Sequence, residues 1–153
     1  MKLIFLDMDG VICTDRAHYS QGEDPNIWHN SSLDREGIGL LNRLADDYDA
    51  TYVLSSTWRT HYDQKWMEDH LRKFGWTGKF HKNWATPKLN ASRGEQILCW
   101  LKQEDEGHDP FVIFDDMSKL NFRTLEANFI ETDASNGISF QDYIKARKIL
   151  DRK

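Results

Sequence analysis

The chain has 153 residues, 39% of them hydrophobic and 12% aromatic, which suits one folded domain and excludes a disordered chain. Its net charge of −5 argues against a protein that coats nucleic acid. Cys13 and Cys99 form no disulfide framework, and the first apolar run is too short for a signal peptide or a membrane span. We therefore expect a cytoplasmic protein with reduced thiols and no membrane contact.

Stretches with strand and helix patterns alternate along the chain. In chain order, we expect a strand at Lys2–Leu6, a helix at Asp34–Tyr48, a strand at Ala50–Ser55, a helix at Asp63–Phe74, a helix at Ser92–Gln103, a strand at Phe111–Phe114, a strand at Asn128–Thr132 and a helix from about Ser139 to Leu150. Fully apolar strands separated by helices predict an α/β fold, a Rossmann-like doubly wound parallel sheet with helices on both faces.

The same pattern predicts a single domain over residues 1–153. The segment between the first strand and the helix at Asp34 is too short for an independent helical cap, so we expect no large cap domain. Residues 15–32 are polar and are a candidate small flap over the site.

The first strand ends in two carboxylates, Asp7 and Asp9, followed by a turn at Gly10. Side chains alternate along a strand, so both acids leave it on the same side. Two like charges so close repel each other unless a cation lies between them or one of them holds a proton. The pair therefore predicts a Mg²⁺ site with oxygen ligands.

Polar pairs also end two other expected strands. Ser55 and Ser56 follow the second, and Asp115 and Asp116 follow the apolar FVIF run. Parallel strands bind ligands at their carboxyl ends. We therefore expect these pairs to join the first two acids in one site.

These motifs resemble those of the haloacid dehalogenase-like (HAD) phosphohydrolase superfamily. Asp7-Met8-Asp9-Gly10-Val11 matches its first motif, YVLSS its second, and the acidic pair after FVIF its fourth. The segments LSSTWR, KFHKNWATP, RGEQILCWL and ETDASNGIS are similar to the domain named for Swiss-army-knife RNA repair proteins and, more distantly, to polynucleotide kinase 3′-phosphatase domains. The resemblance implies a capless, Mg²⁺-dependent phosphomonoester hydrolase that acts through an aspartyl-phosphate.

The resemblance also implies roles for the acids. Asp7 matches the nucleophile, Asp9 the general acid and base, and Gly10 the turn that lets the chain bend away from the phosphate. Asp7, the main-chain carbonyl of Asp9, and the pair Asp115 and Asp116 would hold Mg²⁺. We expect Asp115 to bind the ion directly and Asp116 to act through water or by orienting a basic side chain.

Other residues match the phosphate contacts of the family. We favour Ser56 over Ser55 as the hydroxyl that binds a phosphoryl oxygen, while either serine also suits a turn. Arg93, at the start of a helix, is favoured over Lys88 as the cation that neutralises the phosphoryl group. Arg59 would either grip the substrate phosphate or pair with a surface acid.

Positive charge and aromatic residues gather in one stretch. From Arg59 to Arg93 there are eight Lys and Arg against three Asp and Glu, a local charge of +5, so the rest of the chain carries −10. One interpretation is an amphipathic helix with a solvated basic face and a tryptophan-rich edge to the core. The other is a basic stacking surface for a nucleotide or a single strand.

An open site favours a nucleic-acid 3′-end or a nucleotide phosphate as the substrate. Two alternatives remain open: a phosphatase of another small phosphometabolite or of a phosphoprotein, and a non-catalytic binding module of a nucleic-acid repair complex. Receiver domains also gather acids around Mg²⁺, but they place adjacent acids after the first strand, whereas here the adjacent pair comes late in the chain.

Overall fold

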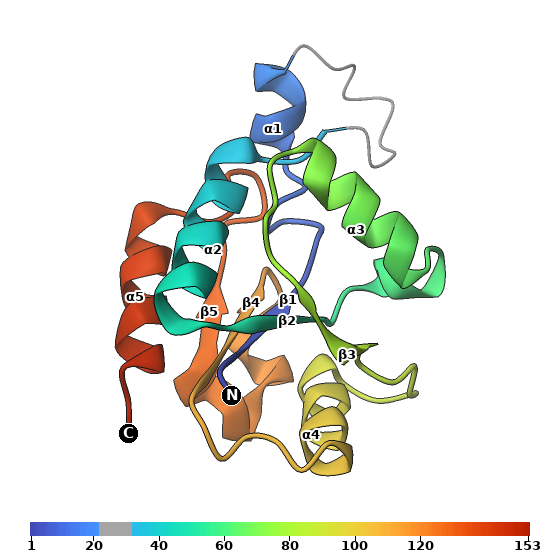
Figure 1. Cartoon of the computed structure of the whole chain (residues 1–153), viewed down its shortest axis with the longest axis vertical. Helices are drawn as coiled ribbons and strands as arrows, with labels where there is room; N and C mark the ends of the chain where they lie inside the picture. Colours follow the sequence, from blue (N-terminus) through green and yellow to red (C-terminus); the bar gives the residue numbers. More distant parts are fainter. Residues whose placement is uncertain (22–31) are drawn as a thin grey trace.

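The structure is a computed structural model that describes residues 1–21 and 32–153. In these residues one all-parallel sheet has the strand order β3-β2-β1-β4-β5 (Figure 1). The strands are β1 (Leu3–Leu6), β2 (Thr51–Leu54), β3 (Phe80–Ala85), β4 (Phe111–Asp115) and β5 (Phe129–Glu131). The α-helices are α1 (Asp15–Ser20), α2 (Arg35–Tyr48), α3 (Gln64–Lys73), α4 (Arg93–Gln103) and α5 (Phe140–Leu150), and η1 (Thr57–Thr60), η2 (Lys119–Asn121) and η3 (Arg123–Asn128) are short 3₁₀ helices. None of these helices is both long and apolar enough to cross a bilayer.

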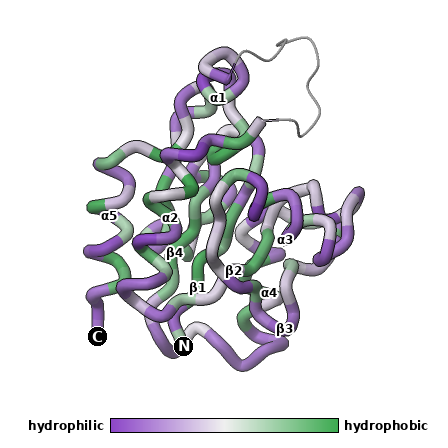
Figure 2. Tube along the Cα trace, turned by 45° about the horizontal axis from the view of Figure 1, so that its top comes forward, coloured by the Kyte–Doolittle hydropathy of each residue, from purple (hydrophilic) through white to green (hydrophobic). Residues whose placement is uncertain are grey.

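The strands direct their side chains alternately into two hydrophobic cores. In β1, Ile4 and Leu6 pack into the core that includes residues of α2, α3 and α5, whereas Leu3 and Phe5 pack into the core that includes residues of α4. Figure 2 shows the hydrophobic residues concentrated along the central strands. Helices therefore cover both faces of the sheet, which confirms the predicted α/β fold class.

The carboxyl edge of the sheet carries the start of α4. The Ser92 hydroxyl accepts from the main-chain N–H of Glu95, and the Glu95 carboxylate accepts from the main-chain N–H of Ser92. This capping box fixes where the helix begins. It makes Arg93 the first helical residue.

One strand and one α-helix were not expected from the sequence, β3 and α1. β3 lies at an edge of the sheet, pairs with β2 alone among the described strands, and leaves Lys82 exposed. An edge strand needs no continuous apolar run, so the sequence carried no strong signal for it. α1 begins at its N-cap Thr14 and takes up the first part of the candidate flap, whereas residues 22–31 of that flap lie outside the described residues.

Candidate active site

The sheet brings three polar side chains to one level of its carboxyl edge. The last residue of β1 pairs with residues of β2 and β4 in the same row, so Asp7, Ser55 and Asp115 come next to one another across the three strands. The main-chain N–H groups of Asp7 and Ser55 continue the ladder, with hydrogen bonds of 3.1 and 3.0 Å to the neighbouring strands. The expected meeting of the strand ends is present in the structure.

Three carboxylates form an acidic cluster at this edge. One oxygen from each of Asp7, Asp115 and Asp116 lies within 4.8 Å of the others. Asp116 lies against Gly10, where a Cβ atom would overlap the carboxylate and where φ is +76°. Burial is the main cause that raises the pKa of Asp7 and of Asp115, and the negative charge of the neighbouring acids adds to it.

Arg93 connects two acids of this cluster. Its Nη1 donates to Asp115 Oδ2 at 2.7 Å and lies 3.2 Å from Asp7 Oδ1. The side chain is 12% exposed, and the positive charge partly offsets the rise in the pKa of both acids. Lys88 is exposed on the loop before α4 and makes no hydrogen bond or ion pair with a described residue. The structure thus brings Arg93, and not Lys88, to the acids.

The two neighbouring acids after FVIF have different surroundings. Asp115 is fully buried, and besides Arg93 it accepts a hydrogen bond of 2.9 Å from the main-chain N–H of Met117. Asp116 is partly exposed and makes no hydrogen bond or ion pair with a described residue. We expect Asp115 to bind the ion directly and Asp116 to act through water or by orienting a basic side chain. In the structure both acids belong to the cluster, and Asp115 is the one of the two that contacts Arg93.

Asp9 lies apart from the acidic cluster. Its side chain is exposed, and its Oδ2 accepts a hydrogen bond of 3.1 Å from Nε1 of Trp58. The carboxylate is not among the three whose oxygens gather within 4.8 Å. The structure thus separates the side chain of Asp9 from the three clustered carboxylates by its hydrogen bond to Trp58.

The two serines after β2 are both buried but differ in their contacts. Ser56 Oγ accepts from the main-chain N–H of Trp58 at 3.2 Å and so caps η1. Ser55 Oγ has no hydrogen-bond partner among the described residues, although it lies at the level of Asp7. A buried hydroxyl without a partner is costly, so Ser55 is as good a candidate for a phosphoryl contact as Ser56.

Arg59 uses its guanidinium within the protein. Its donors bind the main-chain oxygens of Ser56, Thr86 and Pro87 and the Gln96 side chain at 2.6 to 3.3 Å. A guanidinium has five N–H groups, so one remains for a substrate. Burial lowers the pKa of Arg59, which has no acidic partner among the described residues. These hydrogen bonds tie η1 to the loop before α4.

The chain matches the family model described as the HAD domain in Swiss Army Knife RNA repair proteins over residues 3–143. The chain belongs to this family. Its membership supports a HAD-like phosphohydrolase, in agreement with the resemblance of the motifs. Neither the curated proteins nor the solved structures gave a match.

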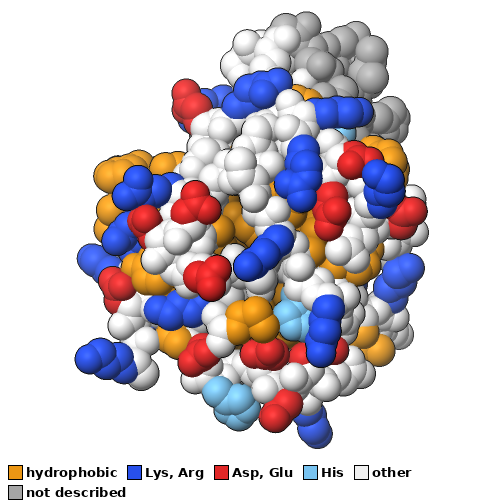
Figure 3. All heavy atoms as spheres, viewed as in Figure 1, with side chains coloured by type: hydrophobic (Ala, Val, Ile, Leu, Met, Phe, Trp, Pro, Cys, Tyr) orange, Lys and Arg blue, Asp and Glu red, His pale blue; other side chains and the backbone are white. Residues whose placement is uncertain are grey.

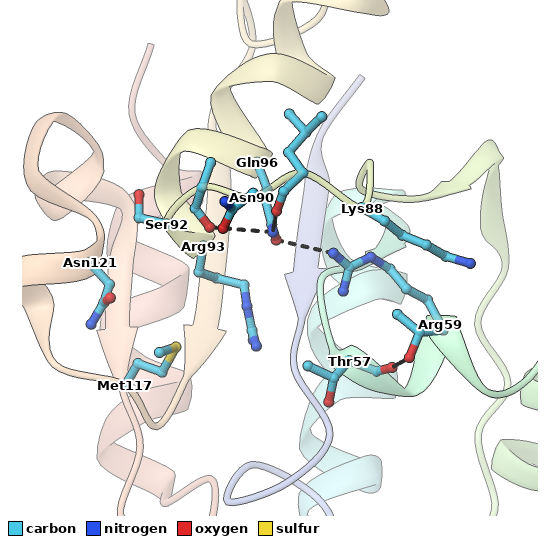
Figure 4. Close-up of a pocket in the computed structure, with 12 residues that line it drawn as sticks. Thr57, Arg59, Lys88, Asn90, Ser92, Arg93, Gln96, Met117 and Asn121 are labelled. Carbon is cyan, nitrogen blue, oxygen red and sulfur yellow. Dashed lines mark hydrogen bonds between the residues drawn. The ribbon is translucent and has the colours of Figure 1, made fainter.

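A cleft of about 490 Å³ opens beside Arg93 in this HAD domain. Figure 4 shows Arg93 on one side of it and Thr57 and Arg59 on the other. Lys88, several uncharged polar side chains and the apolar Leu89, Ala91 and Met117 line the rest, and no Asp or Glu is among the lining residues. A cleft that carries basic side chains and no acid, next to the acidic cluster, suits an anionic group.

The aromatic residues of the basic stretch pack against one another. The rings of Tyr62 and Trp66 stack at 3.7 Å, and Trp58 and Trp76 are buried in the core. Lys65 pairs with an acid on its own helix. Figure 3 shows basic and acidic side chains interspersed on the visible face of the HAD domain. These contacts favour the interpretation as an amphipathic helix with a tryptophan-rich edge over a stacking surface.

Proposed function

We propose that this HAD domain is a Mg²⁺-dependent phosphomonoester hydrolase that acts through an aspartyl-phosphate. The observation that carries the proposal is the contact of Arg93 with both Asp7 and Asp115, beside Asp116. A nucleophile, a cation for the phosphoryl group and a set of oxygen ligands then share one edge of the sheet.

The acidic cluster fits Mg²⁺. Mg²⁺ prefers oxygen ligands, and a divalent cation offsets the repulsion that raises the pKa of Asp7 and Asp115. Asp7 and Asp116 would hold the ion, with the main-chain carbonyl of Asp9, while Asp115 mainly orients Arg93. The bound ion would neutralise negative charge on the phosphoryl oxygens.

In the first step a carboxylate oxygen of Asp7 attacks the phosphorus. The bond from phosphorus to the leaving oxygen breaks, and that oxygen takes its electron pair and the proton of Asp9. Arg93 donates hydrogen bonds to the phosphoryl oxygens, as does the hydroxyl of Ser55 or Ser56. The product is an aspartyl-phosphate and a free alcohol.

In the second step a water molecule attacks the same phosphorus. Asp9, now a carboxylate, accepts the proton of the water, and the bond between phosphorus and Asp7 breaks. Inorganic phosphate leaves and the Asp7 carboxylate is restored. Each acid returns to its starting state, so the chain acts catalytically.

As the substrate we favour a nucleic-acid 3′-end or a nucleotide phosphate. The support is the cleft beside Arg93, where Lys88 pairs with no acid among the described residues and is available to a further negative charge of the substrate. A phosphodiester next to the terminal phosphate, or a second phosphate on a nucleotide, supplies such a charge, whereas a simple sugar monophosphate does not.

Hydrolysis of an aryl phosphate with and without Mg²⁺ tests the activity. We expect phosphate release that requires Mg²⁺ and is abolished by Asp7→Asn. The matched control is Asp105→Asn, which makes the same change at an exposed residue away from the cluster, with a positive φ that Asn tolerates. A wild-type protein that is inert, or no more active than Asp7→Asn, would overturn the proposal.

A comparison of phosphate release from four esters tests the substrate. They are a 3′-phosphorylated oligonucleotide, mononucleotides, a sugar phosphate and a phosphopeptide. We expect the oligonucleotide or a nucleotide to be preferred, with a salt-dependent KM that Lys88→Gln makes less salt-dependent. Preference for the sugar phosphate or the phosphopeptide would reject this substrate class and leave the phosphatase activity standing.

A further inference from the structure

The side chain of Trp58 contacts the acid that would protonate the leaving oxygen. Its Nε1 donates to Asp9 Oδ2 at 3.1 Å, between residues 49 positions apart in the sequence. An indole N–H only donates, and a carboxyl group accepts such a bond best through the oxygen that carries no proton. The hydrogen bond therefore holds Oδ2 and leaves Oδ1 as the oxygen better suited to transfer a proton.

Trp58 is itself firmly held. It is 6% exposed, and its main-chain N–H donates to Ser56 Oγ. Its ring lies edge-on to Tyr62, with centroids 6.0 Å apart, and at 6.4 Å from Trp66. A large ring packed on several sides has little freedom to change rotamer. The exposed carboxylate of Asp9 is therefore bound by a rigid donor.

Asp9 needs such a donor because of its neighbours. It is two residues from Asp7, and the acidic cluster is the proposed place of a divalent cation. A cation attracts any exposed carboxylate within reach, and a carboxylate bound to an ion is not free to transfer a proton. The hydrogen bond from Trp58 opposes movement of the Asp9 side chain toward the cluster.

We infer that Trp58 is a positioning residue for proton transfer by Asp9. It touches no reacting atom and acts by keeping the Asp9 carboxylate apart from the acidic cluster, with Oδ1 as the proton carrier. The inference rests on the proposed function, in which Asp9 protonates the leaving oxygen.

If Trp58 positions Asp9, the loss of kcat/KM in a Trp58 variant should depend on the leaving group of the substrate. A purely structural role of Trp58 predicts the same loss for all leaving groups. An alkoxide needs a proton as it leaves, whereas nitrophenolate is stable enough to leave as an anion. The ratio kcat/KM covers the steps up to the first irreversible one, here formation of the aspartyl-phosphate. It therefore excludes the later hydrolysis, in which Asp9 serves all substrates alike.

The test is Trp58→Phe, which keeps an aromatic ring and removes the N–H. We expect kcat/KM for the best alkyl monoester of the four compared above to fall about 10- to 100-fold, and that for p-nitrophenyl phosphate to change less than about threefold. The control is Trp84→Phe, the same change at a partly buried tryptophan whose indole does not contact Asp9. It should leave both values unchanged.

A second variant excludes a folding defect. Benzothienylalanine at position 58 keeps the two-ring shape and replaces the N–H by sulfur, and it should reproduce the selective loss on the alkyl ester. Equal losses on both esters, or none, in the benzothienylalanine protein would overturn the inference and leave the proposed function intact. A wild-type protein that hydrolyses neither ester would reject the proposed function, and the inference with it.

Discussion

The hydroxyl of Thr132 donates a hydrogen bond of 2.7 Å to the main-chain carbonyl of Gly10, between residues 122 positions apart in the sequence. Both residues are buried, and the main-chain N–H of Thr132 also donates to the carbonyl of Asp115 at 2.9 Å. The residue after β5 is thus bonded to both strand ends that carry the acids. The last strand of the sheet helps to hold the acidic cluster together.

Replacing Thr132 by Val should therefore destabilise the protein. The shape of the side chain is kept, but the buried carbonyl of Gly10 loses its donor, which costs about 1–3 kcal/mol of the free energy of unfolding. Urea unfolding measures the loss directly. Thr132→Ser keeps the hydroxyl and serves as the control, so an equal loss in the Ser and Val variants would show that the hydrogen bond is not the cause.

Arg93 should contribute to phosphoryl transfer and not to ion binding. Arg93→Gln removes the charge that faces the phosphoryl group, and we expect kcat to fall about 10²- to 10³-fold. Because the guanidinium lies next to Asp7 and Asp115 and would repel a cation bound at the acidic cluster, the affinity for Mg²⁺ should stay the same or rise. Steady-state kinetics and calorimetric titration with Mg²⁺ measure the two effects.

The conservative variant Arg93→Lys separates charge from geometry. It keeps the positive charge but not the planar guanidinium, whose Nη1 lies within reach of both acids, so we expect activity between that of the wild type and that of Arg93→Gln. If the affinity for Mg²⁺ fell in Arg93→Gln as much as kcat does, the prediction would be wrong. Arg93 would then act by positioning the ligands of the ion.

The sequence was sufficient to predict four of the five strands, all except β3, and the acids at the edge of the sheet. Continuous apolar runs mark central parallel strands, and the acids that follow them must come to the carboxyl edge. The contacts of individual side chains were not predictable in the same way. Arg59 bonds to main-chain oxygens of a distant loop, and Trp58 bonds to Asp9, because η1 turns both side chains toward elements that the sequence does not place. The sequence likewise does not show which of Asp115 and Asp116 contacts Arg93, because this depends on the direction in which β4 ends.

The two cysteines should differ in reactivity. Burial, followed by the negative charge of Asp9, raises the pKa of Cys13 to about 12, whereas Cys99 is partly exposed. At pH 8 Cys13 is then almost entirely the thiol, whereas the thiolate is the reactive form. A thiol reagent should modify one cysteine per folded chain, and the second only after unfolding. Cys99→Ser should remove the fast reaction, and fast labelling that persists in this variant would contradict the prediction.

The stabilising effect of Mg²⁺ should grow with pH. The pKa values of Asp7 and Asp115 are raised in the folded chain, so each acid binds its proton more readily there than in the unfolded chain. Without a cation, the stability that these acids contribute is present below their ordinary pKa and is lost as the pH rises through the raised values. Mg²⁺ competes with those protons and gains affinity over the same range.

We therefore expect a larger rise in Tm on adding Mg²⁺ at pH 8 than at pH 5, as measured by thermal unfolding. At a concentration about 100 times Kd the gain is about 2.7 kcal/mol, or roughly 5–10 °C for a chain of this size. Asp116→Asn removes one proposed ligand and should reduce the gain at both pH values, whereas Asp105→Asn should leave it intact. A Tm gain that is independent of pH, or that survives in Asp116→Asn, would show that Mg²⁺ binds elsewhere than at the acidic cluster.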